Sequence, residues 1–341
     1  MKRFKQWGCI LVLLLLSVIS CTGNEGIMGL NSQKKRGANA EMKAYPLGRF
    51  SIRIPKNMEQ TGRSHRLRLA QIREFHWPER SNRNEIRNKL WNDRVAEINK
   101  MRPPRHQSRP IIEQREFYDL GQWAKGIFYY GNYALEQEGI WEILIDSGPI
   151  GIWLKTDSLL ADKDNVDKMI RNLSTIAKAF TIRTNDDLHK DTQINWFHLE
   201  NGAINLPYRW QEQTYARFEG HPFDLKLEIE MTDTHTDEPK EEGLLARIAA
   251  VIATGYATGV DIDRIRSHKR KVAGLDGEEE VDRMADRDGT EISFGWRYAG
   301  KKDSGEFPKI VITMESPDGN LDEKLKIWDA ILDSMKPLYK N

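Results

Sequence analysis

Alternation of apolar and polar positions predicts several strands with one buried face. Phe50, Ile52 and Ile54 alternate with polar neighbours across residues 48–55, and a proline ends the run. Residues 223–231 alternate strictly between apolar and charged side chains, and residues 309–316 alternate in the same way. One buried and one solvated face is typical of antiparallel sheets.

Helical spacing of apolar residues predicts four helices. It is clear in residues 166–180, 243–256 and 321–335, and a further helix is suggested across residues 86–98. Asp164 and Asn320 lie where the helix caps before two of these segments are expected. Strands clustered between helices, without regular alternation, favour an α+β fold.

Two segments about 150 residues apart share a pattern and indicate an internal repeat. Residues 48–55 and 202–207 each run from a glycine through alternating apolar positions to a proline, and each is followed by strands and a terminal amphipathic helix. We therefore expect two similarly built α+β domains, residues 45–185 and 193–341, each a mainly antiparallel sheet with packed helices. A single sheet running through both halves is the alternative.

The N-terminus has the pattern of a secretory signal. Lys2, Arg3 and Lys5 precede an apolar run, residues 9–19, that is shorter than the ~20 residues of a membrane-spanning helix. The run ends at Cys21 after a small residue, which resembles the lipobox of bacterial lipoproteins. We expect a signal peptide at residues 1–20, lipidation of Cys21 and a polar tether at residues 21–44. An ordinary cleaved signal with an incidental cysteine is the alternative.

Composition and charge narrow the function. The 341 residues include 39% hydrophobic residues and 10 Trp, which is enough for packed cores. The 52 basic and 51 acidic residues give a net charge of +1, without the basic excess that nucleic-acid-binding proteins show. Removal of the signal peptide leaves Cys21 as the one cysteine, so no disulfide is expected.

Catalytic motifs are missing from the sequence. There is no Gly-x-Ser-x-Gly elbow, no phosphate-binding loop ending in lysine, no His-Glu-x-x-His and no cysteine cluster. Acidic residues between 276 and 282 could gather a hard cation, but they lack the ligand order of an EF-hand loop. We expect neither catalytic residues nor a metal or other cofactor.

Two charged loops are the candidates for partner contact. Residues 63–115 carry 14 Lys and Arg against 6 acids, and their prolines place residues 102–110 in a basic loop. Residues 233–242 form a polar, acidic loop between the strand and the helix predicted on either side. The expected contact residues are Arg102, Arg105, His106, Asp233, His235, Asp237 and Glu238.

The C-terminal half carries motifs of a known family. Residues 271–279 (KVAGLDGEE), 294–297 (FGWR), 308–315 (PKIVITME) and 325–337 closely resemble the type VI secretion lipase-immunity proteins that neutralise class-four phospholipase effectors. Residues 48–55 resemble the N-terminal domain of that family. The resemblance covers about residues 45–338.

This resemblance implies a periplasmic lipoprotein that clamps a secreted phospholipase and blocks its substrate entrance. With the absence of Asp after Cys21, it implies anchoring at the inner leaflet of the outer membrane. The motif residues Gly274, Gly277, Glu278, Trp296 and Trp328 are expected to support the fold, the glycines in a tight turn and the tryptophans in the core. An enzyme with an unrecognised site and a structural or assembly-assisting envelope lipoprotein are the alternatives.

Overall fold

The computed structural model describes residues 41–78, 82–183, 195–236, 261–287 and 289–339. The expected signal peptide, Cys21, almost all of the tether, the boundary at residues 184–192 and the helix at 243–256 lie outside these residues. The described residues form antiparallel sheets with three helices, which confirms the expected α+β fold class.

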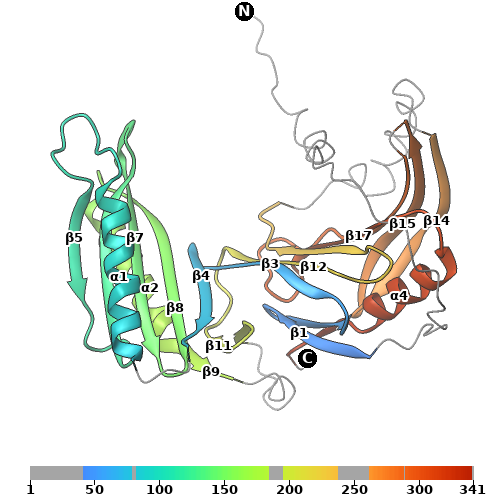
Figure 1. Cartoon of the computed structure of the whole chain (residues 1–341), viewed down its shortest axis with the longest axis horizontal. Coiled ribbons are helices and arrows are strands. Elements are labelled where there is room, and N and C mark those ends of the chain that lie inside the picture. Colours follow the sequence, from blue (N-terminus) through green and yellow to red (C-terminus); the bar gives the residue numbers. More distant parts are fainter. Residues whose placement is uncertain (1–40, 79–81, 184–194, 237–260, 288, 340–341) are drawn as a thin grey trace, which may run out of the picture. The chain divides into compact units, whose positions relative to one another are not determined.

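Twelve strands form the main sheet, and each is antiparallel to its neighbours (Figure 1). In spatial order they are β14 (Asp261–Val272), β15 (Leu275–Asp286), β16 (Gly289–Tyr298), β17 (Lys309–Pro317), β13 (Lys226–Thr232), β12 (Glu212–Glu219), β3 (Glu59–Leu67), β4 (Ala70–His76), β8 (Ile150–Leu159), β7 (Leu135–Ser147), β6 (Trp123–Asn132) and β5 (Ile111–Glu116). One sheet therefore runs through both halves of the sequence, which is the arrangement given above as the alternative.

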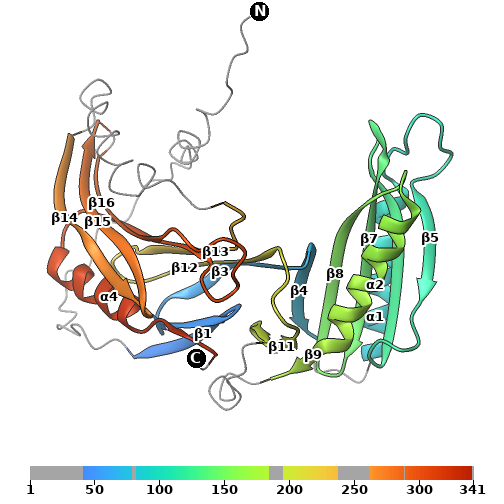
Figure 2. The ribbon, with the colours of Figure 1, turned by 180° about the vertical axis from the view of Figure 1, so that it is seen from behind.

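Three of the predicted helices lie within the described residues, and all three form: α1 (Arg83–Asn99), α2 (Lys163–Ala179) and α4 (Leu321–Asp333). The expected cap at Asp164 is wrong, because Asp162 accepts a hydrogen bond from the Asn165 N–H at 3.1 Å and Asp164 lies in the first turn. Helices α1 and α2 cover opposite faces of the β6–β8 part of the sheet, as Figures 1 and 2 show from the two sides.

Two small sheets explain the internal repeat. The first contains β1 (Met42–Leu47), β2 (Phe50–Pro55) and β18 (Lys336–Pro337), and the second contains β10 (Trp196–His198), β11 (Gly202–Asn205) and β9 (Phe180–Ile182). The two repeated segments thus become the central strands β2 and β11. Each pairs with the strand that follows the terminal helix of the other half, β18 after α4 and β9 after α2.

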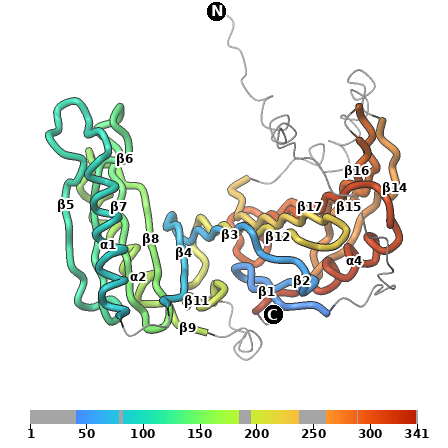
Figure 3. Tube along the Cα trace, viewed as in Figure 1, coloured from blue at the N-terminus to red at the C-terminus, as the bar shows by residue number. Residues whose placement is uncertain are grey.

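Each of the two main hydrophobic cores also contains residues from the opposite half of the sequence. Phe50, Ile52 and Ile54 of β2 are buried among residues 216–339. Figure 3 shows β2 near the C-terminal end of the chain, where β18 pairs with it. Phe197 and Ile204 are buried among residues 67–176. The hairpin that begins each half therefore packs into the core of the other half, while the boundaries 45–185 and 193–341 stay a prediction.

Candidate functional site

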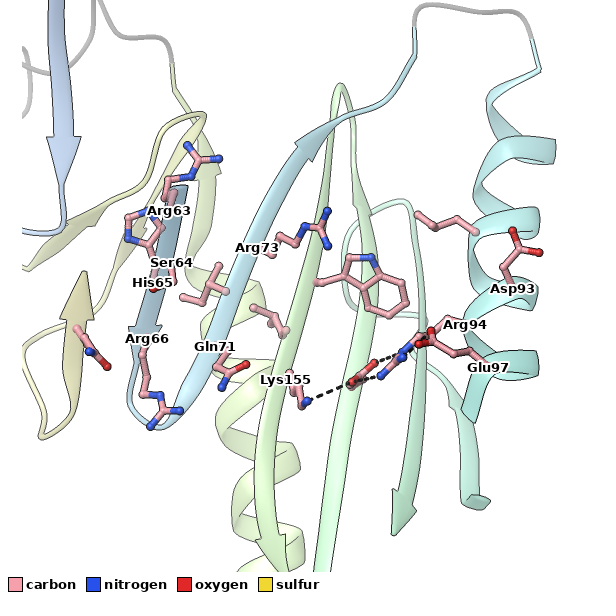
Figure 4. Close-up of a pocket in the computed structure, with 16 residues that line it drawn as sticks. Arg63, Ser64, His65, Arg66, Gln71, Arg73, Asp93, Arg94, Glu97 and Lys155 are labelled. Carbon is pink, nitrogen blue, oxygen red and sulfur yellow. Dashed lines mark hydrogen bonds and ion pairs between the residues drawn. The ribbon is translucent and has the colours of Figure 1, made fainter. Parts of the chain in front are cut away.

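A groove of about 760 Å³ lies where β3 and β4 separate, with α1 as its far wall (Figure 4). The two strands pair only at His65–Ile72, Arg66–Gln71 and Leu67–Ala70, next to their turn. Beyond these pairs β3 follows β12 and β4 follows β8. The lining residues are Arg63, Ser64, His65, Arg66, Gln71, Ile72, Arg73, Leu90, Asp93, Arg94, Glu97, Glu142, Trp153, Leu154, Lys155 and Gln213.

The α1 wall is fixed by buried carboxylates of β7. Arg94 donates to both oxygens of Glu142, at 2.8 Å from Nε and 2.7 Å from Nη2, and these hydrogen bonds raise the pKa of Arg94. The Tyr129 hydroxyl donates to the same carboxylate at 2.6 Å. Arg83 pairs with one carboxylate oxygen of Asp146 and Arg87 pairs with the other. These pairs hold α1 in place and leave little freedom in this wall.

Aromatic residues supply the apolar part of the groove. Trp153 lines it and stacks on the buried Trp91 of α1, with ring centroids 6.3 Å apart and planes 19° apart. Leu90, one residue earlier on α1, also lines the groove. A ligand in the groove would therefore meet a rigid apolar surface between charged rims.

The arginines of the β3 and β4 walls differ in whether they form an ion pair. Arg63 forms an ion pair with Glu200, whereas Arg66 and Arg73 have no ion pair with any residue that the structure describes. Figure 4 shows Arg66 and Arg73 on the two strands that flank the opening. Basic side chains outnumber acidic ones along the lining, so the groove favours an acidic ligand.

The groove lacks the arrangement of a nucleophilic catalyst. Ser64 and His65 are adjacent on β3, so their side chains point to opposite faces. Burial, and then the charge of Arg63, lower the pKa of His65 to about 3, which leaves it a very weak base near neutral pH. The geometry suits binding rather than acid–base chemistry.

The predicted basic loop lies beside the β6–β7 hairpin. Arg102, Arg105 and His106 are exposed, and the Arg102 guanidinium lies 5.2 Å from the ring centroid of Tyr133. The backbone N–H of His106 donates to Glu136 at 3.3 Å. These residues are accessible to a partner, and their role as contacts stays a prediction.

The predicted acidic loop is described only at its start. Asp233 accepts hydrogen bonds from the Tyr208 hydroxyl at 3.0 Å and from the Gln211 N–H at 2.5 Å, so its carboxylate holds a turn. His235 is exposed, accepts from the Trp210 indole and contacts Asp303 at 3.0 Å. Asp237 and Glu238 lie outside the described residues.

The motif residues of the C-terminal half lie around β15. Trp296 and Trp328 are fully buried, and the Trp328 indole donates to Glu279 at 2.8 Å. Gly274 lies in the two-residue turn from β14 to β15 with a φ of 81°. Gly277 is not part of this turn, because it lies within β15 against Trp296.

Strand alternation divides the acidic cluster at residues 276–282. Glu279 is buried and contacts Arg270 and His268, whereas Glu280 contacts Arg264. Glu278, half-buried, shares the Glu280 face of β15. Within the part of the chain that the structure describes, no group of three or more His, Cys, Asp or Glu is placed to hold a metal ion.

Sequence reasoning missed the groove residues Arg66, Arg73, Trp153 and Lys155. The basic excess of residues 63–115 was a signal, since Arg63, Arg66, Arg73 and Arg94 all come from it. The other wall comes from β7 and β8, and no local pattern reveals which distant strands are neighbours.

Comparison with known proteins gives one family match and several structural ones. Residues 197–338 match the family model of the Tle cognate immunity protein 4 C-terminal domain. The apo structure of the T6SS immunity protein TplEi from Pseudomonas aeruginosa is similar with a TM-score of 0.68 and 17% identity, over 88% of this chain and 98% of that chain. No curated protein matches the chain.

Two further structures have the same fold. A chain in the crystal structure of the Tle4–Tli4 complex is similar with a TM-score of 0.69 and 16% identity, over 88% of this chain and 98% of that chain. TplEi from Pseudomonas aeruginosa complexed with "L" peptide is similar with a TM-score of 0.64 and 15% identity, over 89% of this chain and 100% of that chain.

Proposed function

We propose, on the confirmed resemblance to the T6SS immunity proteins, that this chain is an immunity protein that binds and blocks a secreted phospholipase effector. The observation that carries the proposal is the match of residues 197–338 to the immunity-protein domain, supported by the fold that 88% of this chain shares with TplEi. In this proposal the chain inhibits by binding the effector and blocking its substrate entrance, and it catalyses no reaction itself.

The groove between β3, β4 and α1 is the proposed binding site for a protruding segment of the effector. Arg66 and Arg73, which form no ion pair with a described residue, can pair with acidic side chains of that segment. Trp153, stacked on Trp91 of α1, offers an apolar surface. Buried aromatic and arginine contacts commonly dominate the energy of such interfaces.

Binding and inhibition by the purified mature chain test the proposal. We expect a stoichiometric complex with the phospholipase effector of the same genome, together with loss of that effector's lipid hydrolysis. Arg66→Glu with Arg73→Glu is expected to weaken binding at least about 100-fold, because two attractions become repulsions. The matched control is Lys326→Glu with Lys336→Glu, two exposed lysines outside the groove.

Absence of a complex with the effector, or lipid hydrolysis by the immunity chain itself, would contradict the function. Equal weakening by the groove pair and by the control pair would instead contradict the site.

The proposed location is the periplasm, with anchoring through a lipid on Cys21 at the inner leaflet of the outer membrane. Among the described residues, none of the helices is both long and apolar enough to cross a membrane. Several acyl chains give stable attachment where one is marginal. Cys21→Ser is expected to move the protein from the membrane fraction to the soluble fraction, and unchanged fractionation with unchanged processing would refute the anchor.

A further inference from the structure

One edge of β4, which continues from the groove at Arg73, lacks a neighbouring strand among the described residues. Residues 73–76 pair with β8 on one side, from Arg73–Trp153 to His76–Ile150. On the other side the pairing with β3 stops at Ile72. Within the described part of the chain, no strand continues along this side of β4. Unpaired backbone groups on such an edge can bind a further strand.

The hairpin geometry identifies the backbone groups that face the opening. Leu67 and Ala70 close the two-residue turn, so the N–H and C=O of Ala70 point toward β3. Backbone direction alternates along a strand, and the same groups of Glu74 and His76 therefore point to the open side. The Trp77 N–H agrees with this alternation, because it points to the β8 side and donates to the carbonyl of Pro149 at 3.1 Å.

The turn between β10 and β11 connects β3 and β4 where the two strands separate. The Glu74 carboxylate accepts hydrogen bonds from the N–H groups of Glu200 at 3.0 Å and Asn201 at 3.2 Å. The side chain of Glu200 forms an ion pair with Arg63 of β3. The turn from β10 to β11 thus bridges the two strands beneath the opening, so the separation is part of the folded structure.

The turn at the base of the groove is fixed as well. The Arg68 guanidinium donates to the carbonyl of Pro207 at 2.7 Å, and the Asn172 side chain donates to the carbonyl of Arg68 at 2.6 Å. Arg68 and Leu69 both have positive φ, 50° and 74°, as a tight two-residue turn requires. The free edge is therefore held ready at both ends.

We propose that an extended, acidic segment of the effector binds by adding a strand to this free edge of β4. This inference rests on the proposed function. The backbone of Glu74 and His76 would form the main-chain hydrogen bonds, as in other cases of strand addition. Alternate side chains of the segment would face Arg66, Arg73 and Trp153, where charge complementarity favours acidic residues.

A proline at position 76 tests the backbone contribution directly. His76→Pro removes an N–H that faces the opening and leaves the pairing with β8 intact, which an edge strand tolerates. His76→Ala is the matched control, because both variants lose the imidazole contact with Asn201 but only proline loses the N–H. We expect the dissociation constant of the effector complex to be at least tenfold higher for proline than for alanine.

Amide hydrogen exchange of the unmodified chain gives a second, independent readout. The N–H groups of Glu74 and His76 are expected to exchange at least tenfold more slowly in the effector complex than in the free chain. Equal affinities of the two variants, or unchanged exchange at both amides in a formed complex, would overturn strand addition while the proposed function stands. Failure of the unmodified chain to bind the effector would overturn both.

Discussion

Gly277 lies directly against the ring of Trp296, and a Cβ at position 277 would approach Cε2 of that ring to 2.5 Å. The carbonyl oxygen of Arg297 would lie 2.7 Å from the same Cβ. Trp296 is fully buried and its indole donates to the carbonyl of Arg270 at 3.0 Å, so the ring cannot move aside. The absence of a side chain at position 277 is therefore a packing requirement.

Alanine at the two motif glycines is expected to destabilise the chain for different reasons. Gly277→Ala should cost about 3 kcal/mol of unfolding free energy through overpacking against Trp296. Gly274→Ala meets no atom within 4 Å, so only its positive φ opposes it, and about 1 kcal/mol is expected. Urea unfolding measures both, and a larger cost at position 274 would contradict the packing argument.

Two buried histidines are expected to make the chain less stable in acid. Burial lowers the pKa of His65 to about 3 and of His198 to about 4, from an ordinary value of 6.5, with nearby arginines adding to both shifts. Between pH 7 and pH 5 the unfolded chain therefore binds protons that the folded chain does not. The free energy of unfolding therefore decreases by about 2 kcal/mol per histidine as the pH drops from 7 to 5.

Asparagine variants separate this effect from other titrating groups. His65→Asn or His198→Asn should each remove about 2 kcal/mol of the difference in stability between pH 7 and pH 5. The exposed His106→Asn is the control and should leave that difference unchanged. An unaltered pH dependence in both buried variants would show that these histidines do not titrate as argued.

Charge reversal in the basic loop should change association and not stability. Arg102→Glu with Arg105→Glu is expected to slow effector association about tenfold at low salt, and less at high salt, because both side chains are exposed. Asp233→Asn should instead lower stability by about 1 to 2 kcal/mol, since its carboxylate holds the turn at Gln211. Stopped-flow mixing and thermal melting distinguish the two, and unaltered association at low salt would remove the basic loop from the interface.

Separated halves should fold poorly because each lacks the hairpin that its core requires. A fragment of residues 193–341 loses Phe50, Ile52 and Ile54, whose burial contributes roughly 2 kcal/mol each. A fragment of residues 45–185 loses Phe197 and Ile204 from its own core. We expect either fragment alone to bind the effector more weakly than the intact chain, and co-expression of both to restore a cooperative thermal transition. A fragment that melts like the intact chain would contradict the exchange.

Local patterns predicted the elements far better than their partners. The spacing of Ile86, Leu90, Val95 and Ile98 predicted α1, and these residues pack in a core cluster, but the ion pairs of Arg83, Arg87 and Arg94 were not predicted. Their partners Glu142 and Asp146 lie on a strand 48 to 63 residues away, and nothing in the sequence indicates that these charged residues are buried. Strand pairing is also non-local. The repeat was therefore visible in the sequence, whereas the pairing of each repeated segment with the other half was not.

The edge strand β14 of the main sheet bears on how the chain behaves at high concentration. The outer edge strand β14 has a dense row of cations, including Arg264, Arg266, Lys269, Arg270 and Lys271. Four of them form ion pairs with acidic residues of β15 and α4, and charged side chains on an edge strand hinder its pairing with a strand of another molecule. This edge therefore opposes growth of a sheet from molecule to molecule when the chain is abundant.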